Sequence, residues 1–210
     1  MKNIAIWGAA SGLGAAMVEH FHQHEFQVLA IARNPDRNPR INQLDLTHFS
    51  CDATDEVQVR ETVSKLPADT IHISTMGSFN ADVPVDYIGH RHLVNALEEF
   101  GHRRMLLVTS LGCGDSWQYL SERSKKGFGA AVREKSLAEA WLMSSTLDFT
   151  IVRPGGLKDG QANGKGELSQ NTEVHGLITR SEVARLCACL LEDSDSIGQI
   201  YQCVDPSMHY

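Results

Sequence analysis

Glycines near the amino terminus are the first residues whose type and spacing suggest chemistry. Gly8, Gly12 and Gly14 come directly after the apolar run 4–7 and open a stretch with helical spacing. A strand, a tight turn and a helix N-terminus in this order direct free backbone N–H groups and partial positive charge toward an anion. Small residues also let the backbone approach a pyrophosphate closely. The sequence therefore predicts a dinucleotide-binding loop built from Gly8, Ala10, Ser11, Gly12, Leu13 and Gly14.

Basic residues follow the second apolar run, at 28–32. Arg33 and Asn34 stand where NAD-selective proteins usually carry an acid that binds the ribose hydroxyls, and Arg37 is close by. A guanidinium can form charge-assisted hydrogen bonds with a 2′-phosphate, which an acid would repel. We therefore predict that Arg33 and Asn34 bind NADP(H), in preference to NAD. The alternative is a solvated arginine at the end of a strand.

Apolar runs typical of strands alternate along the chain with stretches of helical spacing. Strands are predicted at 4–7, 28–32, 71–76, 105–109, 149–152 and 200–204, and helices at 15–24, 56–66, 85–100, 128–144 and 181–192. Ser181 is the predicted N-cap of the last helix, and Asp52 or Thr54 could cap the second. The alternation indicates an α/β fold with a doubly wound parallel sheet, covered on both faces by helices.

Four motifs together resemble the short-chain dehydrogenase/reductase superfamily. They are the Gly-x-x-x-Gly-x-Gly opening, Thr109-Ser110, the turn at 153–157 and the segment 177–184. Over nearly its whole length the chain is similar to the atypical branch that includes NmrA-like proteins and the biliverdin-IXβ and flavin reductases. The resemblance implies a Rossmann-type fold with a single NAD(P)-binding domain over 1–210. It also implies substrate-side loops at about 112–127 and 158–176.

The resemblance also implies where the rest of the cofactor lies. Asp52 and Ala53 would border the adenine, although Asp52 could equally cap a helix. The backbone of Thr75, Met76 and Gly77 would pass close to a ribose, unless Gly77 merely ends a strand. The other implied cofactor-binding residues, at the nicotinamide end, are Thr109, Pro154, Gly155 and Gly156.

Ser110, Lys135 and Tyr119 are the candidate catalytic residues. Ser110 would face the nicotinamide end, where its hydroxyl could position a carbonyl-like acceptor or stabilise developing charge; its alternative role is to cap a turn. Lys135 would hold the nicotinamide ribose, or else be a solvated lysine paired with a neighbouring acid. The tyrosine expected four residues before this lysine is replaced by Ala131, which argues against ordinary alcohol–ketone interconversion. Tyr119 is the candidate substitute, with simple packing as its alternative.

Composition excludes several classes of partner. The 210 residues carry a net charge of −7 without a basic arm, so we expect no nucleic-acid partner. No long apolar segment or leader-like start is present, so a cytoplasmic protein without membrane contact is expected. Five cysteines without a Cys-x-x-Cys pair predict buried thiols, not disulfides or zinc. His20, His22 and His24 fit a solvent-facing helix better than a metal site, so no metal is predicted.

These features favour an NADPH-dependent reductase that transfers a hydride to a conjugated small molecule such as a flavin, a quinone or a linear tetrapyrrole. One alternative is an NADP-sensing regulatory module of the NmrA-like kind, because fold does not fix function. Another is a biosynthetic ketone or imine reductase in which Tyr119 or His175 supplies the proton. We expect a monomer or a small homo-oligomer.

Overall fold

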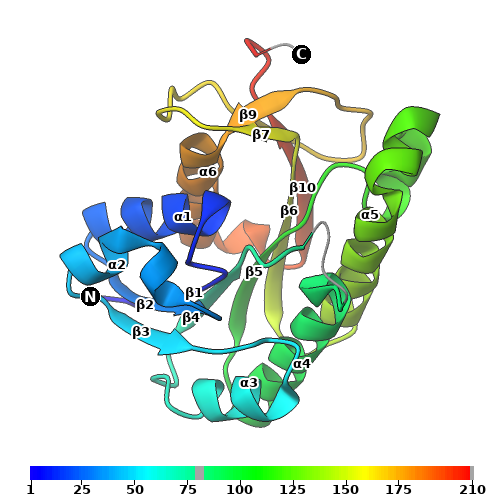
Figure 1. The fold of residues 1–210 in the computed structure, drawn as a ribbon. Coiled ribbons are helices and arrows are strands. Elements are labelled where there is room, and N and C mark those ends of the chain that lie inside the picture. The colour runs from blue at the N-terminus through cyan, green and yellow to red at the C-terminus, as the bar shows by residue number, and fades with distance from the viewer. Residues whose placement is uncertain (79–82, 209–210) are drawn as a thin grey trace.

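A sheet of eight strands forms the centre of the protein (Figure 1). The computed structural model describes residues 1–78 and 83–208. In spatial order the strands are β3 (Thr47–Ser50), β2 (Gln27–Ala32), β1 (Asn3–Trp7), β4 (Ile71–Ser74), β5 (Arg104–Val108), β6 (Asp148–Pro154), β10 (Gln199–Val204) and β8 (Glu167–Ser169). Every pair is parallel except β8 with β10, which is antiparallel. The order reverses beside β1, so the prediction of a doubly wound Rossmann-type sheet is confirmed.

Helices cover both faces of this sheet. One face carries α1 (Gly12–Gln23) and α6 (Arg180–Glu192), and the other carries α3 (Glu56–Val63), α4 (Val85–Glu99) and α5 (Glu122–Met143) (Figure 1). Shorter elements are α2 (Pro39–Gln43), the 3-10 turns at Pro35–Arg37, Gly114–Tyr119 and Ser194–Ser196, and a two-stranded sheet of β7 (Gly156–Lys158) and β9 (Leu177–Thr179). The helices close off both faces of the sheet, which leaves the carboxyl ends of the strands as the place for a ligand.

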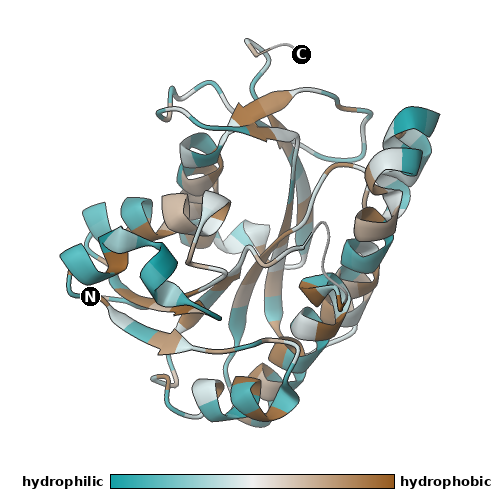
Figure 2. Cartoon of the chain, in the orientation of Figure 1, coloured by the Kyte–Doolittle hydropathy of each residue, from teal (hydrophilic) through white to brown (hydrophobic). Residues whose placement is uncertain are grey.

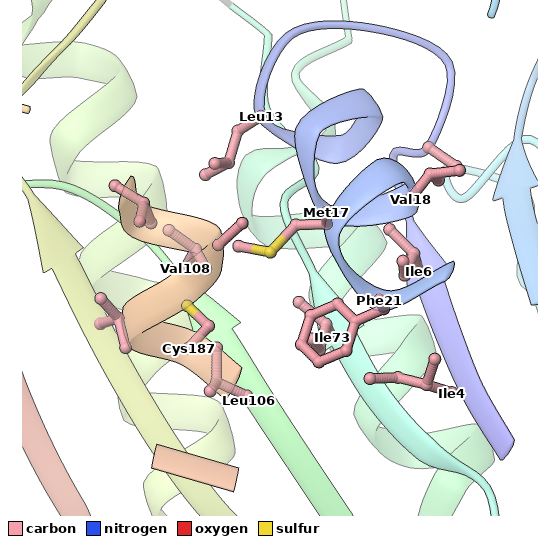
Figure 3. Packing of buried hydrophobic residues seen from close by; sticks show 14 of the residues in the cluster. Ile4, Ile6, Leu13, Met17, Val18, Phe21, Ile73, Leu106, Val108 and Cys187 are labelled. Atoms are coloured by element: carbon pink, nitrogen blue, oxygen red, sulfur yellow. The ribbon is translucent and has the colours of Figure 1, made fainter. Parts of the chain in front are cut away.

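Two hydrophobic cores fill the layers. Ile4 and Ile6 of β1 face α1, where Met17 and Phe21 lie over them (Figure 3). The alternate residue Trp7 belongs to the second core, against α3, α4 and α5. Apolar colour is concentrated in the central strands and polar colour on the outward helix faces (Figure 2). Strands buried on both faces read as continuous apolar runs, which is why the sequence located them.

Helix starts are where the sequence predictions were wrong. The last helix is capped by Thr179, whose hydroxyl accepts from the Glu182 N–H, and not by Ser181. Neither Asp52 nor Thr54 caps α3; the cap is Asp55. Several residues in a row could accept the same N–H groups, so sequence alone could not choose among them.

The two predicted substrate-side loops are shorter and more ordered than expected. Helix α5 begins at Glu122, six residues before the predicted start at Phe128, because Ser121 caps it by accepting from the Ser124 N–H. The stretch 158–176 contains β8, which pairs with β10.

Strand β4 ends at Ser74, two residues before the predicted end at Met76, so Thr75 and Met76 lie beyond it.

Cysteines follow the predicted burial with one exception. Cys51, Cys113, Cys187 and Cys203 are buried free thiols, whereas Cys189 is exposed on α6. Burial raises the pKa of the Cys203 thiol to about 12. A thiol with such a pKa stays protonated and behaves as a small apolar side chain.

Candidate active site

The glycine loop between β1 and α1 has the geometry that close approach to a ligand requires. Gly8 and Gly12 have φ angles of +90° and +55°, in the region that favours glycine. A Cβ on Gly14 would lie 2.0 Å from the Gly8 carbonyl oxygen, so only glycine lets the helix start against the turn. The loop is also fastened from outside, because the buried Asn38 side chain donates to the Ala9 carbonyl at 3.0 Å.

A cleft of about 490 Å³ opens beside this loop, at the carboxyl ends of β1, β2 and β4. Ten of the residues predicted to bind the cofactor line it: Gly8, Ala10, Ser11, Arg33, Asn34, Asp52, Ala53, Thr75, Met76 and Gly77. The lining also includes Arg37, Thr54 and Ser78. The structure therefore brings together residues from four separate loops that the sequence pattern had placed at one edge of the sheet.

The other predicted cofactor residues do not line the cleft. Leu13 and Gly14 are buried beneath the loop, and Thr109 is buried at the end of β5. Pro154 ends β6, and the next two glycines lead into β7. A Cβ on Gly155 would lie 2.4 Å from the Gly176 carbonyl oxygen, so Gly155 is explained by tight chain packing.

The side of the cleft at the end of β2 is basic and open to solvent. Arg33, Asn34 and Arg37 are exposed there. Asp52, which follows β3, also lines the cleft, and its carboxylate accepts from the Thr54 N–H at 3.0 Å and from its hydroxyl at 2.8 Å. Asp52 therefore shapes the turn that borders the cleft. In the described part of the chain no side chain pairs with the guanidinium groups of Arg33 and Arg37, which leaves them available to an anion.

Lys135 forms a partly buried ion pair that reaches the end of β4. Its Nζ lies 2.8 Å from Oδ1 of the fully buried Asp86 and donates to the Met76 carbonyl at 3.3 Å. The other oxygen of Asp86 accepts from the N–H and the hydroxyl of Ser78, at 2.8 and 2.9 Å. A Cβ on Gly77 would lie 2.9 Å from Nζ. Lys135 is thus neither solvated nor paired along its own helix. Its ion pair with Asp86 of α4 holds the ammonium beside Met76, which lines the cleft.

His90 extends this buried cluster, and sequence reasoning missed it. Its Nε2 lies 2.8 Å from the Ser74 hydroxyl, and Nδ1 lies 2.6 Å from the Asp86 carbonyl oxygen. Burial first, and then the Lys135 charge, lower the pKa of His90 to about 4. The imidazole is therefore neutral at pH 7 and links the end of β4 to α4 without adding charge.

Ser110 lies half-buried two residues beyond the end of β5, with its hydroxyl 3.7 Å from the Cys113 thiol. This weak contact leaves the hydroxyl able to bind another group. Tyr119 ends the 3-10 turn at Gly114–Tyr119 and is half-buried, and neither residue lines the cleft. His175 is exposed, with Nε2 2.8 Å from the Glu173 carboxylate.

An arginine and a glutamate, both missed by the sequence analysis, support the strand ends below Ser110. Arg153 donates to the Glu139 carboxylate through Nε at 3.0 Å and through a terminal nitrogen at 2.7 Å. Thr109 donates to the same carboxylate at 2.6 Å and does not line the cleft. Burial alone would lower the pKa of Arg153, but Glu139 and Asp115 outweigh it and raise the pKa. Arg153 therefore stays charged, and the contacts of Glu139 with Arg153 and Thr109 join β5, β6 and α5.

The long segment after β7 is tied down by one buried carboxylate, that of Glu182 in α6. Its oxygens accept from the backbone N–H groups of Asn163, Gly164 and Gly166 at 3.1, 3.0 and 2.8 Å. Arg185 donates to it as well, at 2.6 Å. These hydrogen bonds fix the backbone of the second predicted substrate-side loop at residues 163–166.

We expect the contribution of the Glu182 carboxylate to the free energy of unfolding to depend on pH. Burial raises the pKa of Glu182, but hydrogen bonds from Arg185, Gly166 and Gly164 outweigh it and lower the pKa below its ordinary value of 4.5. The stabilisation is complete above that value and is lost as the pH falls through the folded-state pKa. Glu182→Gln should cost about 2 kcal/mol at pH 7. Urea unfolding of both proteins from pH 7 to pH 3 should show this difference shrink; a constant difference would contradict it.

A second groove, of about 570 Å³, lies between α5 and β10. Gly114 and Asp115 from the first predicted substrate-side loop line it, together with Asn171 from the second. Arg153 and Glu139 form its polar floor. Both loops therefore contribute residues to one groove, on the α5 side of the sheet.

Comparison with known proteins places the chain. A profile of the NAD(P)H-binding family matches residues 8–194. The chain belongs to this family. Among solved structures, the chain is similar to ChuY, an anaerobillin reductase from Escherichia coli O157:H7, with 40% identity over 100% of both chains and a TM-score of 0.91. The oxidoreductase ylbE from Lactococcus lactis covers 99% of this chain with a TM-score of 0.84, and at 24% identity it shows the shared fold alone.

The matches to curated relatives extend over a smaller part of those proteins. Sanguinarine reductase from Eschscholzia californica is 33% identical over 114 residues, which are 51% of this chain and 40% of that protein. Protein TIC 62 from Oryza sativa is 26% identical over 222 residues, 89% of this chain and 42% of that protein. The chain spans about half the length of the curated relatives it matches. These findings confirm the predicted NAD(P)H-binding family and support the expectation of an NAD(P)H-dependent oxidoreductase.

Among residues 1–78 and 83–208, no helix combines the length and the apolar character needed to cross a bilayer. Within the same ranges, no three histidine, cysteine or acidic side chains gather as a metal site would require. The rings of His20 and His24 stack on each other at 4.2 Å on the surface of α1.

Proposed function

We propose that this protein is an NADPH-dependent reductase that transfers a hydride to a flat, conjugated small molecule, with linear tetrapyrroles as the first class to test. The observation that carries the proposal is the cleft itself, which joins a glycine loop to a basic end at Arg33 and to Lys135 near Gly77. The loop at Gly8 and Gly14 has no room for a Cβ, so its backbone is bare of side chains there. A bare backbone lets a pyrophosphate approach closely, and the cleft therefore fits a dinucleotide. Full-length similarity to an anaerobillin reductase supports a tetrapyrrole-type acceptor.

The residues divide the work as follows in this proposal. The glycine loop and the N-terminus of α1 bind the pyrophosphate, Arg33 and Asn34 bind the 2′-phosphate, and Lys135 holds the nicotinamide ribose. Bound NADPH would supply the hydride. The Ser110 hydroxyl donates a hydrogen bond to the acceptor and positions it. Since Ala131 replaces the usual tyrosine, water supplies the proton.

The deciding experiment is anaerobic consumption of NADPH with a panel of acceptors. Biliverdin, FMN, a quinone and a simple ketone should be compared at equal concentration, with NADH measured alongside. Turnover with a conjugated acceptor and not with the ketone supports the proposal. Tight binding of NADP⁺ without turnover of any acceptor would instead support the NADP-sensing module. Turnover of the ketone alone, lost on replacing Tyr119 or His175, would support the carbonyl reductase.

Preference for NADPH should depend on Arg33. We expect Arg33→Met to raise the KM for NADPH about tenfold or more, because a charge-assisted hydrogen bond to the 2′-phosphate is lost. The KM for NADH should change little. Arg40→Met is the matched control, because Arg40 is an exposed arginine paired with Glu19 outside the cleft. Equal effects of Arg33→Met on both cofactors would contradict the assignment.

A further inference from the structure

Arg180 brings a cation to the glycine loop from the other end of the chain. It is the first residue of α6, and its Nε lies 3.7 Å from the position of a Cβ on Gly12. Gly12 in turn is the first residue of α1. The packing of α6 beside α1 (Figure 1) therefore places a guanidinium at the helix N-terminus that faces the cleft.

Two features of Arg180 are costly unless an anion binds there. A cation in the first turn of α6 opposes the helix dipole. Its Nε is also buried and has no hydrogen-bond partner in the described part of the chain, which leaves a donor unsatisfied. Within residues 1–78 and 83–208 its one ion-pair partner is Asp159, which lies 2.7 Å from a terminal nitrogen of Arg180 and is itself 94% exposed. Such a surface pair contributes little and is easily exchanged.

The N-terminus of α1 likewise has no anion of its own. Its first turn holds no acidic residue, and the N-cap Ser11 makes no side-chain hydrogen bond to the helix. The other long helices differ, since the first turns of α3, α4, α5 and α6 contain Glu56, Asp86, Glu122 and Glu182. Free N–H groups and an unpartnered Arg180 Nε–H thus meet where one oxygen-rich anion could bind both.

We infer that Arg180 binds the pyrophosphate of the cofactor, exchanging Asp159 for a phosphate oxygen. This inference rests on the cofactor site in the proposed function. It adds to that site a residue of α6, which lies far along the chain from the glycine loop. Arg180 lies beside Gly12 at the start of α1, whereas Arg33 follows β2. The two arginines therefore read different parts of one ligand: Arg33 the 2′-phosphate, and Arg180 the phosphates shared by NADP(H) and NAD(H).

Equilibrium binding of three nucleotides to the intact protein tests this division. NADP⁺ contains both groups, NAD⁺ contains only the pyrophosphate, and 2′-AMP contains only the 2′-phosphate. Arg180→Met should weaken NADP⁺ and NAD⁺ about tenfold each and leave 2′-AMP unchanged. Arg33→Met should weaken NADP⁺ and 2′-AMP and spare NAD⁺. Asp159→Asn, which removes only the exposed partner, should bind all three as well as wild type or slightly more tightly.

Several results would overturn the inference. Unchanged NADP⁺ and NAD⁺ affinity in Arg180→Met would do so, and so would an equal loss for 2′-AMP, which would indicate a disturbed fold. If cofactor affinity is unchanged but the KM for a carboxylate-bearing acceptor rises, Arg180 serves the acceptor instead. If wild type binds none of the three nucleotides, the cofactor site itself is wrong and the assignment of Arg180 falls with it. Binding needs no turnover, so failure of the proposed reaction alone leaves this test intact.

Discussion

Arg153→Met should lower the free energy of unfolding by about 3–5 kcal/mol, because it leaves a buried carboxylate without its cation. Arg153 and Glu139 are 4% and 2% exposed, and two hydrogen bonds of 3.0 and 2.7 Å join them. Among the residues that the structure describes, Thr109 would then be the one hydrogen-bond donor left to the Glu139 carboxylate. Urea unfolding at pH 7 measures the loss, and the slope should stay that of wild type if the folded state is preserved.

Two controls separate the buried pair from charge in general. The double variant Arg153→Met with Glu139→Gln should recover much of the stability, because no unpaired charge remains buried. Asp115→Asn removes the other partner of Arg153, which is 69% exposed, and should cost less than about 1 kcal/mol. If Arg153→Met unfolds at the wild-type urea concentration, the buried pair does not stabilise the strand ends.

The sheet could be predicted because its information is local. Strands such as β1 and β2 are continuous apolar runs, and continuous runs are what burial on both faces requires. Strand β8 could not be found in this way. Its three residues include one apolar side chain, and it exists because Gln202 and Val204 of β10 offer a free edge. Such a pairing depends on tertiary context, which no short window of sequence contains.

The candidate site divides along the same line. The glycine loop and Arg33 were predicted because a few neighbouring residues are enough to identify a tight turn after a strand and the first residue beyond a strand. Asp86 and Glu139 were missed because their partners, Lys135 and Arg153, lie on other elements. An acid in the first turn of a helix, as at Asp86, is ordinarily explained by the helix dipole. Only the fold shows that it faces a lysine.

Lys135→Met should weaken NADP⁺ binding about tenfold or more and should also destabilise the protein. The ammonium is the charged group that α5 offers to the end of β4, with Nζ 3.3 Å from the Met76 carbonyl oxygen. Its loss removes the proposed hydrogen bonds to the nicotinamide ribose. It also leaves the fully buried Asp86 carboxylate without its cation, at a cost of about 3–5 kcal/mol. Nucleotide titration and urea unfolding measure the two effects separately.

The double variant Lys135→Met with Asp86→Asn separates a structural role of Lys135 from a binding role. Asparagine keeps an oxygen for the Ser78 N–H and hydroxyl and removes the charge, so stability should largely return. Cofactor affinity should not return, because the group that meets the ribose is still missing. Asp86→Asn alone should weaken binding less than Lys135→Met, since it loosens the lysine without removing it. If the double variant regains both stability and NADP⁺ affinity, Lys135 acts only through the fold, and the ribose must be held by other groups of the cleft.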